Sequence, residues 1–197
     1  MNSELIRNDF PILKTKVGGH QIVYFDNAAT TQRPLPVVNA VLDYTTHENG
    51  NPHRGAHIFA ISASEAYDTS KEVVRDFIHA RSEKEIIYTR NTSESLNLVA
   101  RSYGETHLKA GDHILITIAE HHSNLVTWQR VAQKTGATLD YIYVDKETGH
   151  FPEEELKKID DPRVKLFAFA EVSNVLGIDF DPKPLIQRAH AHGAIVV

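Results

Sequence analysis

The sequence predicts an α/β fold in which a mostly parallel sheet carries helices on both faces. Short apolar segments rich in branched residues recur along the 197-residue chain, and segments with helical spacing of apolar residues separate them. Strands that alternate with helices form βαβ units, whose strands run parallel and are connected right-handedly. With 41% hydrophobic and 24% charged residues, the chain suits one globular domain with a proper core.

Composition excludes several classes of protein. The net charge is −5 with the 12 histidines neutral, so no nucleic-acid partner is indicated. No apolar run approaches the roughly 18 residues that span a bilayer, and the first residues lack a signal-peptide core. The absence of cysteine excludes disulfides, thiolate metal sites and a cysteine nucleophile in this chain. We therefore expect a cytoplasmic protein without a membrane partner.

Residues 1–23 are predicted to form an N-terminal arm that covers hydrophobic surface. Ser3 can cap a short helix, which must end near Pro11 because a residue before proline is pushed out of the α region. Gly18 and Gly19 then form a turn into an expected strand at residues 22–25. The remainder, residues 24–197, is expected to be the main domain.

Two helices and one strand are expected before residue 90. Pro34 and Pro36 suit the first turn of a helix that ends in the breaker cluster at 47–52 and turns its apolar side chains inward: Val37, Val38, Val41 and Leu42. The longest helix is expected at 61–80, with its apolar face in the core, and a short strand at 85–89.

The rest of the chain repeats a strand-and-helix unit. Asn91 and Glu94 have capping-box spacing at the start of a helix that continues through Tyr103. Gly136 and Gly193 suit the positions just past two helix ends. The expected strands lie at 113–118, 138–144, 164–170 and 194–197, and the expected helices at 123–135, 153–159 and 184–192. Ser123 is the expected cap of the first of these helices.

Polar turns supply the candidate site residues. Thr92 and Ser93 would lie at a helix N-terminus, where free N–H groups and two hydroxyls form either an anion seat or a simple cap. His53 and Arg54 lie in a polar loop that either grips a carboxylate or phosphate or is ordinary solvated surface. His53 and His57 would also make half of a metal site, but no acidic ligand lies at a matching spacing.

Three of these turns follow strands and meet at one edge of the predicted sheet. They contain Thr92 and Ser93, then His121 and His122, then Ser173 and Asn174. Ligands bind parallel α/β sheets at this edge. A phosphate seat, an imidazole and a side-chain amide together suit a flat phosphorylated heterocycle.

At these residues the sequence resembles the class V branch of fold-type-I pyridoxal-phosphate enzymes, and most closely the SufS-type cysteine desulfurases and selenocysteine lyases. Five ordered blocks carry the resemblance: residues 24–31 (YFDNAATT), 53–57 (HRGAH), 90–94 (RNTSE), 120–124 (EHHSN) and 172–177 (VSNVLG). The resemblance implies the large domain of the fold-type-I transferase fold. It also implies removal of sulfur from L-cysteine or L-selenocysteine, a sulfur-acceptor protein in iron–sulfur cluster assembly, and a homodimer.

The resemblance also implies roles for individual residues. Thr92 and Ser93 would hold the phosphate of pyridoxal 5′-phosphate, and His121 would stack on its ring and exchange protons with substrate. Asn174 would meet the ring hydroxyl or the substrate carboxylate. Four more residues would lie on the substrate side or at the mouth of the site, in part across the dimer interface: Ala28, Ala29, His53 and Arg54. Asn91 stands where the family has glycine, and asparagine can adopt glycine-like backbone angles.

Parts of the family pattern do not occur in these 197 residues. They include the Asp that pairs with the pyridine nitrogen, the Ser-x-His-Lys whose lysine forms the Schiff base, the catalytic Cys and the small domain. The chain stops within an apolar strand at Val197, so we expect an N-terminal portion that cannot turn over alone. Alternatives are another class V enzyme (an aminotransferase, an epimerase or a kynureninase-like enzyme) and a non-catalytic assembly module. A further alternative is a metal-dependent hydrolase using His53, His57, His121 and His122.

Overall fold

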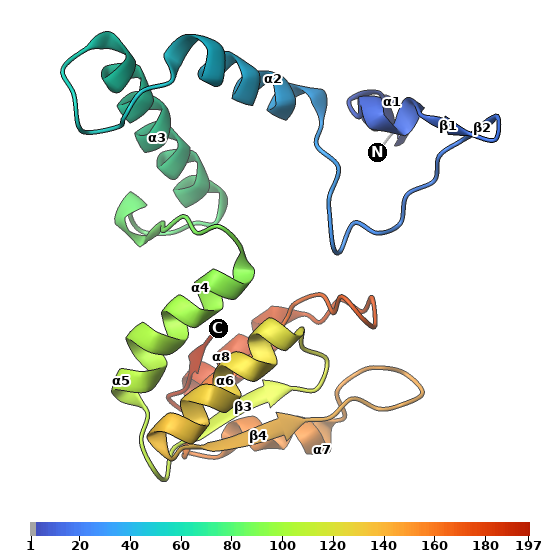
Figure 1. Ribbon diagram of the computed structural model, residues 1–197. Coiled ribbons are helices and arrows are strands. Elements are labelled where there is room, and N and C mark those ends of the chain that lie inside the picture. The colour runs from blue at the N-terminus through green and yellow to red at the C-terminus, as the bar shows by residue number, and fades with distance from the viewer. Residues whose placement is uncertain (1–2) are drawn as a thin grey trace. The chain divides into compact units, whose positions relative to one another are not determined.

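The computed structural model describes residues 3–197, which divide into two compact units (Figure 1). The first runs through Ile87 and the second spans Tyr88–Val197. The two units differ in kind, because the sheet and nearly all of the buried core belong to the second. The expected division between an arm at 1–23 and a domain at 24–197 stays a prediction.

The second unit is built on a four-stranded parallel sheet in the order β4-β3-β5-β6. Its strands are β3 (His113–Thr117), β4 (Thr138–Ile142), β5 (Val164–Ala168) and β6 (Ile195–Val196). All four were predicted, and each is one to two residues shorter than expected at its carboxyl end. β4 lies at one edge of the sheet. β3 pairs with β5 in parallel, so the carboxyl ends of these two strands are neighbours.

Helices cover both faces of this sheet, as the sequence predicts. They are α4 (Thr92–Val99), continued by η4 (Ala100–Gly104) and α5 (Glu105–His107), then α6 (His122–Thr135), α7 (Glu153–Leu156) with η5 (Lys157–Asp160), and α8 (Pro182–Ala191). In Figure 1, α6 lies in front of β3 and β4, whereas α7 and α8 lie behind the sheet. Side chains alternate accordingly: Ile114 and Ile116 pack with Trp128 of α6, and Leu115 packs with Leu185 of α8.

The first unit consists of short elements and two helices. They are α1 (Ser3–Asn8), η1 (Pro11–Lys14), the hairpin of β1 (Lys16–Val17) and β2 (His20–Gln21), α2 (Leu35–Asp43), η2 (Tyr44–Glu48), α3 (Ile58–Phe77) and η3 (Glu83–Glu85). The helices were predicted, although α3 begins and ends about three residues earlier than expected. Among the described residues, no helix is both long and apolar enough to cross a membrane.

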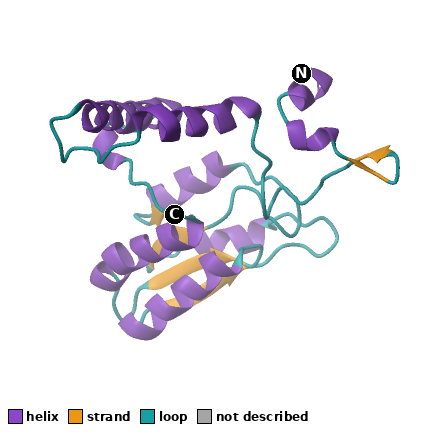
Figure 2. Ribbon diagram, turned by 45° about the horizontal axis from the view of Figure 1, so that its top comes forward, coloured by secondary structure: helices purple, strands orange, loops and turns teal. Residues whose placement is uncertain are grey.

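Two predicted strands of this region are wrong. Residues 22–25 and 86–89 lack strand structure, and the segment between β2 and α2 is drawn as loop in Figure 2. Both segments have the composition of strands, but no neighbouring strand within residues 3–197 pairs with them. A strand needs a hydrogen-bonded partner, so composition alone does not form one. Phe25 is 93% exposed as a result.

The apolar faces of α2 and α3 are not buried within the described residues. The sequence predicts inward-facing side chains on both helices, yet Val41 is 60% exposed and Phe77 is 84% exposed. In the first unit the buried apolar residues are Ala60, Ala63 and Ile86. The prediction of two helices is therefore confirmed, whereas the prediction that their apolar side chains are buried is wrong for the described residues.

Candidate active site

The turn before α4 builds an N-terminus suited to an anion. The Oδ1 atom of Asn91 accepts a hydrogen bond from the Glu94 N–H at 2.9 Å, which confirms the predicted cap. The Glu94 carboxylate returns to the N–H of Arg90 at 2.7 Å and also binds the Arg90 guanidinium. These bonds from Arg90 hold the pKa of Glu94 below its usual range.

Asn91 does not adopt the glycine-like conformation considered from the sequence. Its backbone is extended, with φ −169° and ψ 169°, which any residue tolerates. The N–H groups of Thr92 and Ser93 donate no hydrogen bond within residues 3–197, and their hydroxyls neither donate nor accept one there. Free amides at the positive end of the helix dipole form a seat for a phosphate.

His121 directly precedes α6 and is its N-terminal cap. Its Nδ1 atom accepts the Ser123 N–H at 3.1 Å and lies 2.8 Å from the Ser123 hydroxyl. The expectation that Ser123 caps this helix is therefore wrong, because an imidazole nitrogen can accept the same amide bond that a hydroxyl would. An amide nitrogen only donates, so Nδ1 carries no proton and Nε2 remains for other contacts. His122 is the first helical residue and is exposed.

One cavity of about 330 Å³ brings Ser93 and His121 together. The remaining lining comes from both helices: Asn97, His122, Ser123, Val126, Thr127 and Arg130. Asn97 joins the two helices, since its amide donates to the Ser93 carbonyl at 2.8 Å and to the Thr127 hydroxyl at 3.3 Å. The lining contains one arginine and no carboxylate, so its electrostatics favour an anion.

Asn174 lies outside this lining, in the loop that follows β5. It is exposed, whereas its neighbour Ser173 is 1% exposed and donates to the Ala119 carbonyl at 3.0 Å. That bond joins the loop after β5 to the loop after β3, which carries His121. Thr92 also lies outside the lining, directly before Ser93. The structure therefore brings Ser93 and His121 into a common cavity, with Thr92 next to Ser93 in sequence, and places Asn174 in a loop that is hydrogen-bonded to the loop carrying His121.

Sequence reasoning missed Arg130, Asn97 and Glu120. Thr127 and Arg130 follow Ser123 by four and seven residues on one face of α6, and Asn97 follows Ser93 by one turn. Helical spacing from the two predicted site residues would have found them. Glu120 contacts Ala170, fifty residues away in sequence, and no local spacing signals that contact.

The other predicted residues belong to the first unit. Ala28 and Ala29 form an exposed turn closed by the Thr30 N–H on the Asp26 carbonyl at 3.2 Å. His53 has a left-handed φ of 58°, and its Nε2 atom lies 3.4 Å from the Asp68 carboxylate. Arg54 is exposed and has no ion pair or hydrogen bond within residues 3–197.

No arrangement of ligands favours a metal within the described part of the chain. His57 caps α3 through Nδ1, which accepts the Ala60 N–H at 3.3 Å. Residues 3–197 contain no group of three or more His, Cys, Asp or Glu side chains placed to hold an ion. The metal-dependent hydrolase hypothesis has no geometric support from these residues.

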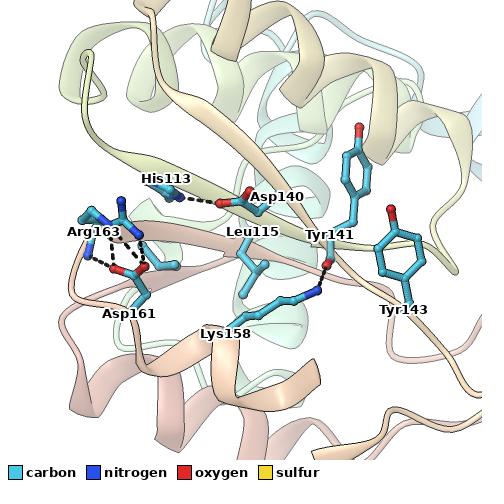
Figure 3. A pocket seen from close by; sticks show the side chains of 9 residues that line it. His113, Leu115, Asp140, Tyr141, Tyr143, Lys158, Asp161 and Arg163 are labelled. Carbon is cyan, nitrogen blue, oxygen red and sulfur yellow. Dashed lines mark hydrogen bonds and ion pairs between the residues drawn. The ribbon is translucent and has the colours of Figure 1, made fainter. Parts of the chain in front are cut away.

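A second cavity of the same unit, about 380 Å³, lies toward the amino ends of β3 and β5 (Figure 3). The charged residues of its lining all have ion-pair partners: His113 with Asp140, Arg163 with Asp161, and Lys158 with Glu155 outside the lining. The bonds from Arg163 hold the pKa of Asp161 well below its usual range. This cavity is at the opposite end of the strands from Ser93 and His121, and its charges are already neutralised.

The parallel sheet, the free N-terminus of α4 and the imidazole after β3 are the features to compare with known proteins. The chain belongs to the aminotransferase class-V family, whose model matches residues 23–197.

Named relatives narrow the comparison. The chain is 45% identical to a probable cysteine desulfurase from Synechocystis sp. over 192 residues, covering 98% of the chain and 46% of that protein. It is also 45% identical to a probable cysteine desulfurase from Halalkalibacterium halodurans, covering 100% of the chain and 48% of that protein. The chain spans about half the length of the curated relatives it matches.

Solved structures have the same fold. An apo cysteine desulfurase from Thermococcus onnurineus superposes with a TM-score of 0.87 at 40% identity, covering 98% of this chain and 46% of that one. The cysteine desulfurase CsdA of Escherichia coli, in its S-sulfonic acid form, gives a TM-score of 0.83 at 34% identity, covering 100% and 48%. The predicted fold class and family resemblance are confirmed.

Proposed function

We propose that the whole protein is a pyridoxal 5′-phosphate-dependent cysteine desulfurase. It removes sulfur from L-cysteine, releases L-alanine and leaves the sulfur as a persulfide on a cysteine of the enzyme. The names of the relatives and their 45% identity over nearly the whole chain support this proposal. These 197 residues contain no cysteine, so the proposal assigns the persulfide to another part of the protein.

The observation that carries the proposal is the cavity shared by Ser93 and His121. Its residues fit the cofactor, because unpaired amides at the start of α4, one arginine and the lack of a lining carboxylate suit a phosphate. An imidazole on the same cavity suits a flat aromatic ring. Thr92 and Ser93 would hold the phosphate, and Asn174 would contact the ring hydroxyl or the substrate carboxylate.

The residues of the chain contribute binding, orientation and proton transfer. When bound, pyridoxal phosphate supplies an electron sink that stabilises negative charge at the substrate α-carbon. His121 is held by Ser123 through Nδ1 and would hold or move a substrate proton at Nε2. The first turn of α4 would hold the phosphate of the cofactor, and His121 would contact its ring.

The substrate and partner assignments extend the same proposal. His53 and Arg54 would contact the substrate carboxylate near the mouth of the site, and Arg54 has no competing ion pair within residues 3–197. Ala28 and Ala29 would line the substrate side. We propose a homodimer, which the exposed apolar faces of α2 and α3 support, and a sulfur-acceptor protein. Selenocysteine as substrate and the cytoplasmic location stay predictions.

Product analysis tests the proposal. Whole protein supplied with L-cysteine, a thiol reductant and pyridoxal phosphate should release alanine and sulfide in equal amounts. The 197-residue chain alone should release neither, because it lacks the Ser-x-His-Lys lysine. Reduction with borohydride followed by peptide mass analysis should find no phosphopyridoxyl lysine that forms specifically in this chain. Alanine release by the 197 residues alone would contradict the assignment of the imine lysine to another part of the protein. If the whole protein released no alanine, the proposed desulfurase activity would be contradicted.

A further inference from the structure

We propose that Glu120 is a positioning residue, which sets the location of His121 relative to Asn174; the proposal rests on the function proposed above. The Glu120 carboxylate contacts three separate segments. Its Oε1 atom accepts the Thr117 hydroxyl at the end of β3 and the Ala170 N–H after β5, the latter at 3.0 Å. Its Oε2 atom accepts the Asn124 amide in the first turn of α6 at 2.6 Å.

These contacts lie close in sequence to the two residues predicted to contact the cofactor ring, His121 and Asn174. Glu120 directly precedes His121, and Ala170 begins the stretch that leads to Asn174. The Ser173 hydroxyl makes a second connection, because it donates to the Ala119 carbonyl at 3.0 Å. Two hydrogen bonds, from Ala170 to Glu120 and from Ser173 to Ala119, therefore hold the chain after β3 against the chain after β5.

The network continues into the core. The Oδ1 atom of Asn124 accepts the indole N–H of Trp128 at 2.8 Å, and both residues are buried. A carboxylate only accepts and an indole N–H only donates, so the amide of Asn124 has a single orientation that satisfies both. His121 is held in turn by the first turn of α6, through Ser123. The backbone N–H of Asn124 also donates to the His121 carbonyl at 2.8 Å, so the position of His121 depends on Glu120 through Asn124.

Exchanging the two hydrogen-bonding groups tests this dependence. Glu120→Gln leaves one acceptor oxygen for two sides, so its NH₂ must face either the NH₂ of Asn124 or the N–H of Ala170. Asn124→Asp places two carboxylates together. The double variant E120Q/N124D restores a matched donor and acceptor, and its new carboxylate still accepts from Trp128. Glu105→Gln is the control, since Glu105 pairs with Lys134 near the other end of α6.

Two measurements on the whole protein follow the network and the site separately. Trp128 is the only tryptophan of these residues. Labelling with 5-fluorotryptophan and ¹⁹F NMR therefore gives one resonance from them, which reports on the indole of Trp128. Calorimetry with pyridoxine 5′-phosphate, which lacks the aldehyde and forms no adventitious imines, reports on the cofactor site. Each single variant should shift the Trp128 resonance and weaken binding about tenfold, as expected when a buried donor or acceptor loses its partner. E120Q/N124D should recover both signals, and Glu105→Gln should change neither.

The outcomes separate the two proposals. Single variants that remain folded by circular dichroism, shift the Trp128 resonance and bind pyridoxine 5′-phosphate as tightly as wild type would show that Glu120 is only structural. A double variant that recovers the resonance but not the binding would also overturn the positioning role. Failure of the wild-type protein to bind pyridoxine 5′-phosphate would instead overturn the proposed function, and the positioning role with it.

Discussion

Ser93 occupies a position where charge has opposite effects on the fold and on the proposed ligand. Replacement by Asp puts a negative charge at the N-terminus of α4, which favours the helix. The same charge repels a phosphate. We expect Ser93→Asp to leave the melting temperature unchanged or slightly higher and to weaken pyridoxine 5′-phosphate binding by at least about tenfold, the loss of one charge-assisted bond.

Ser102→Asp is the control for Ser93→Asp. Its hydroxyl donates to the Leu98 carbonyl at 2.7 Å, farther along the same continuous helical segment and outside the cavity. That substitution should leave affinity unchanged. Equal affinity for wild type and Ser93→Asp, measured by calorimetry, would argue against a phosphate at this helix terminus.

At the scale of elements, the edge strand β4 is protected by side chains of α7 and η5. Ile142 directs its carbonyl to the Ile118 N–H, so the alternate residues Tyr141 and Tyr143 direct their backbone groups outward. Lys158 donates to the Tyr141 carbonyl at 2.8 Å, and Glu155 accepts the Tyr143 N–H at 2.8 Å. Such capping of outward groups discourages another strand from adding to the edge.

Removing the side chains of Glu155 and Lys158 should expose the outer backbone groups of β4. We expect Glu155→Ala/Lys158→Ala to form concentration-dependent species larger than wild type in sedimentation velocity, and to lose about 1 kcal/mol of stability. Glu154→Ala/Lys157→Ala removes the same charges from the neighbouring pair, which does not contact β4. Identical sedimentation of the two double variants would show that the edge is protected in another way.

The contact of α8 with η5 carries a pH dependence. Two bonds from the Arg188 guanidinium, at 2.6 and 2.7 Å, lower the pKa of Asp160 from its ordinary value of 3.8. Because the folded pKa lies below the unfolded one, this stabilisation is complete above pH 3.8 and is lost as pH falls through the folded value.

Thermal unfolding from pH 6 to pH 2 measures this effect. The melting temperature should fall below pH 4, and Asp160→Asn should flatten that part of the curve while lowering the plateau. Asp179→Asn is the control, since the Asp179 carboxylate has no ion pair or hydrogen bond within the described residues. Parallel curves for wild type and Asp160→Asn below pH 4 would contradict the assigned cause.

At the scale of the whole molecule, the two units should differ in local stability. The second unit buries large side chains such as Trp128 and Phe167 completely, whereas the described first unit buries two alanines and Ile86. Hydrogen exchange of the 197-residue chain should therefore be slower by on the order of a hundredfold or more in β3 and α6 than in α2. Equal protection of α2 and α6 would show that the exposed face of α2 is covered in solution.

The difference in burial between the two units explains which elements could be predicted from the sequence. The strand β3 was predicted because its segment is short, apolar, rich in branched residues and bounded by turn residues. The end of α6 was predicted from Gly136, whose φ of 79° suits glycine. The wrongly predicted strand at 85–89 also contains branched and aromatic residues that favour strands, but strand formation depends on a distant partner that propensity does not encode. The contact of Glu120 with Ala170 likewise depends on the sheet order and not on spacing in the sequence.

The sheet order has a kinetic consequence. The helix α6 alone connects β3 to β4, so the contacts among these three elements join residues that are close in sequence. Pairing of β5 with β3 closes a longer loop, which costs more conformational entropy. We expect the segment from β3 through β4 to form first as the folding nucleus. Mutation of Val131 in α6 should slow refolding of the chain, and mutation of Leu185 in α8 should mainly speed unfolding.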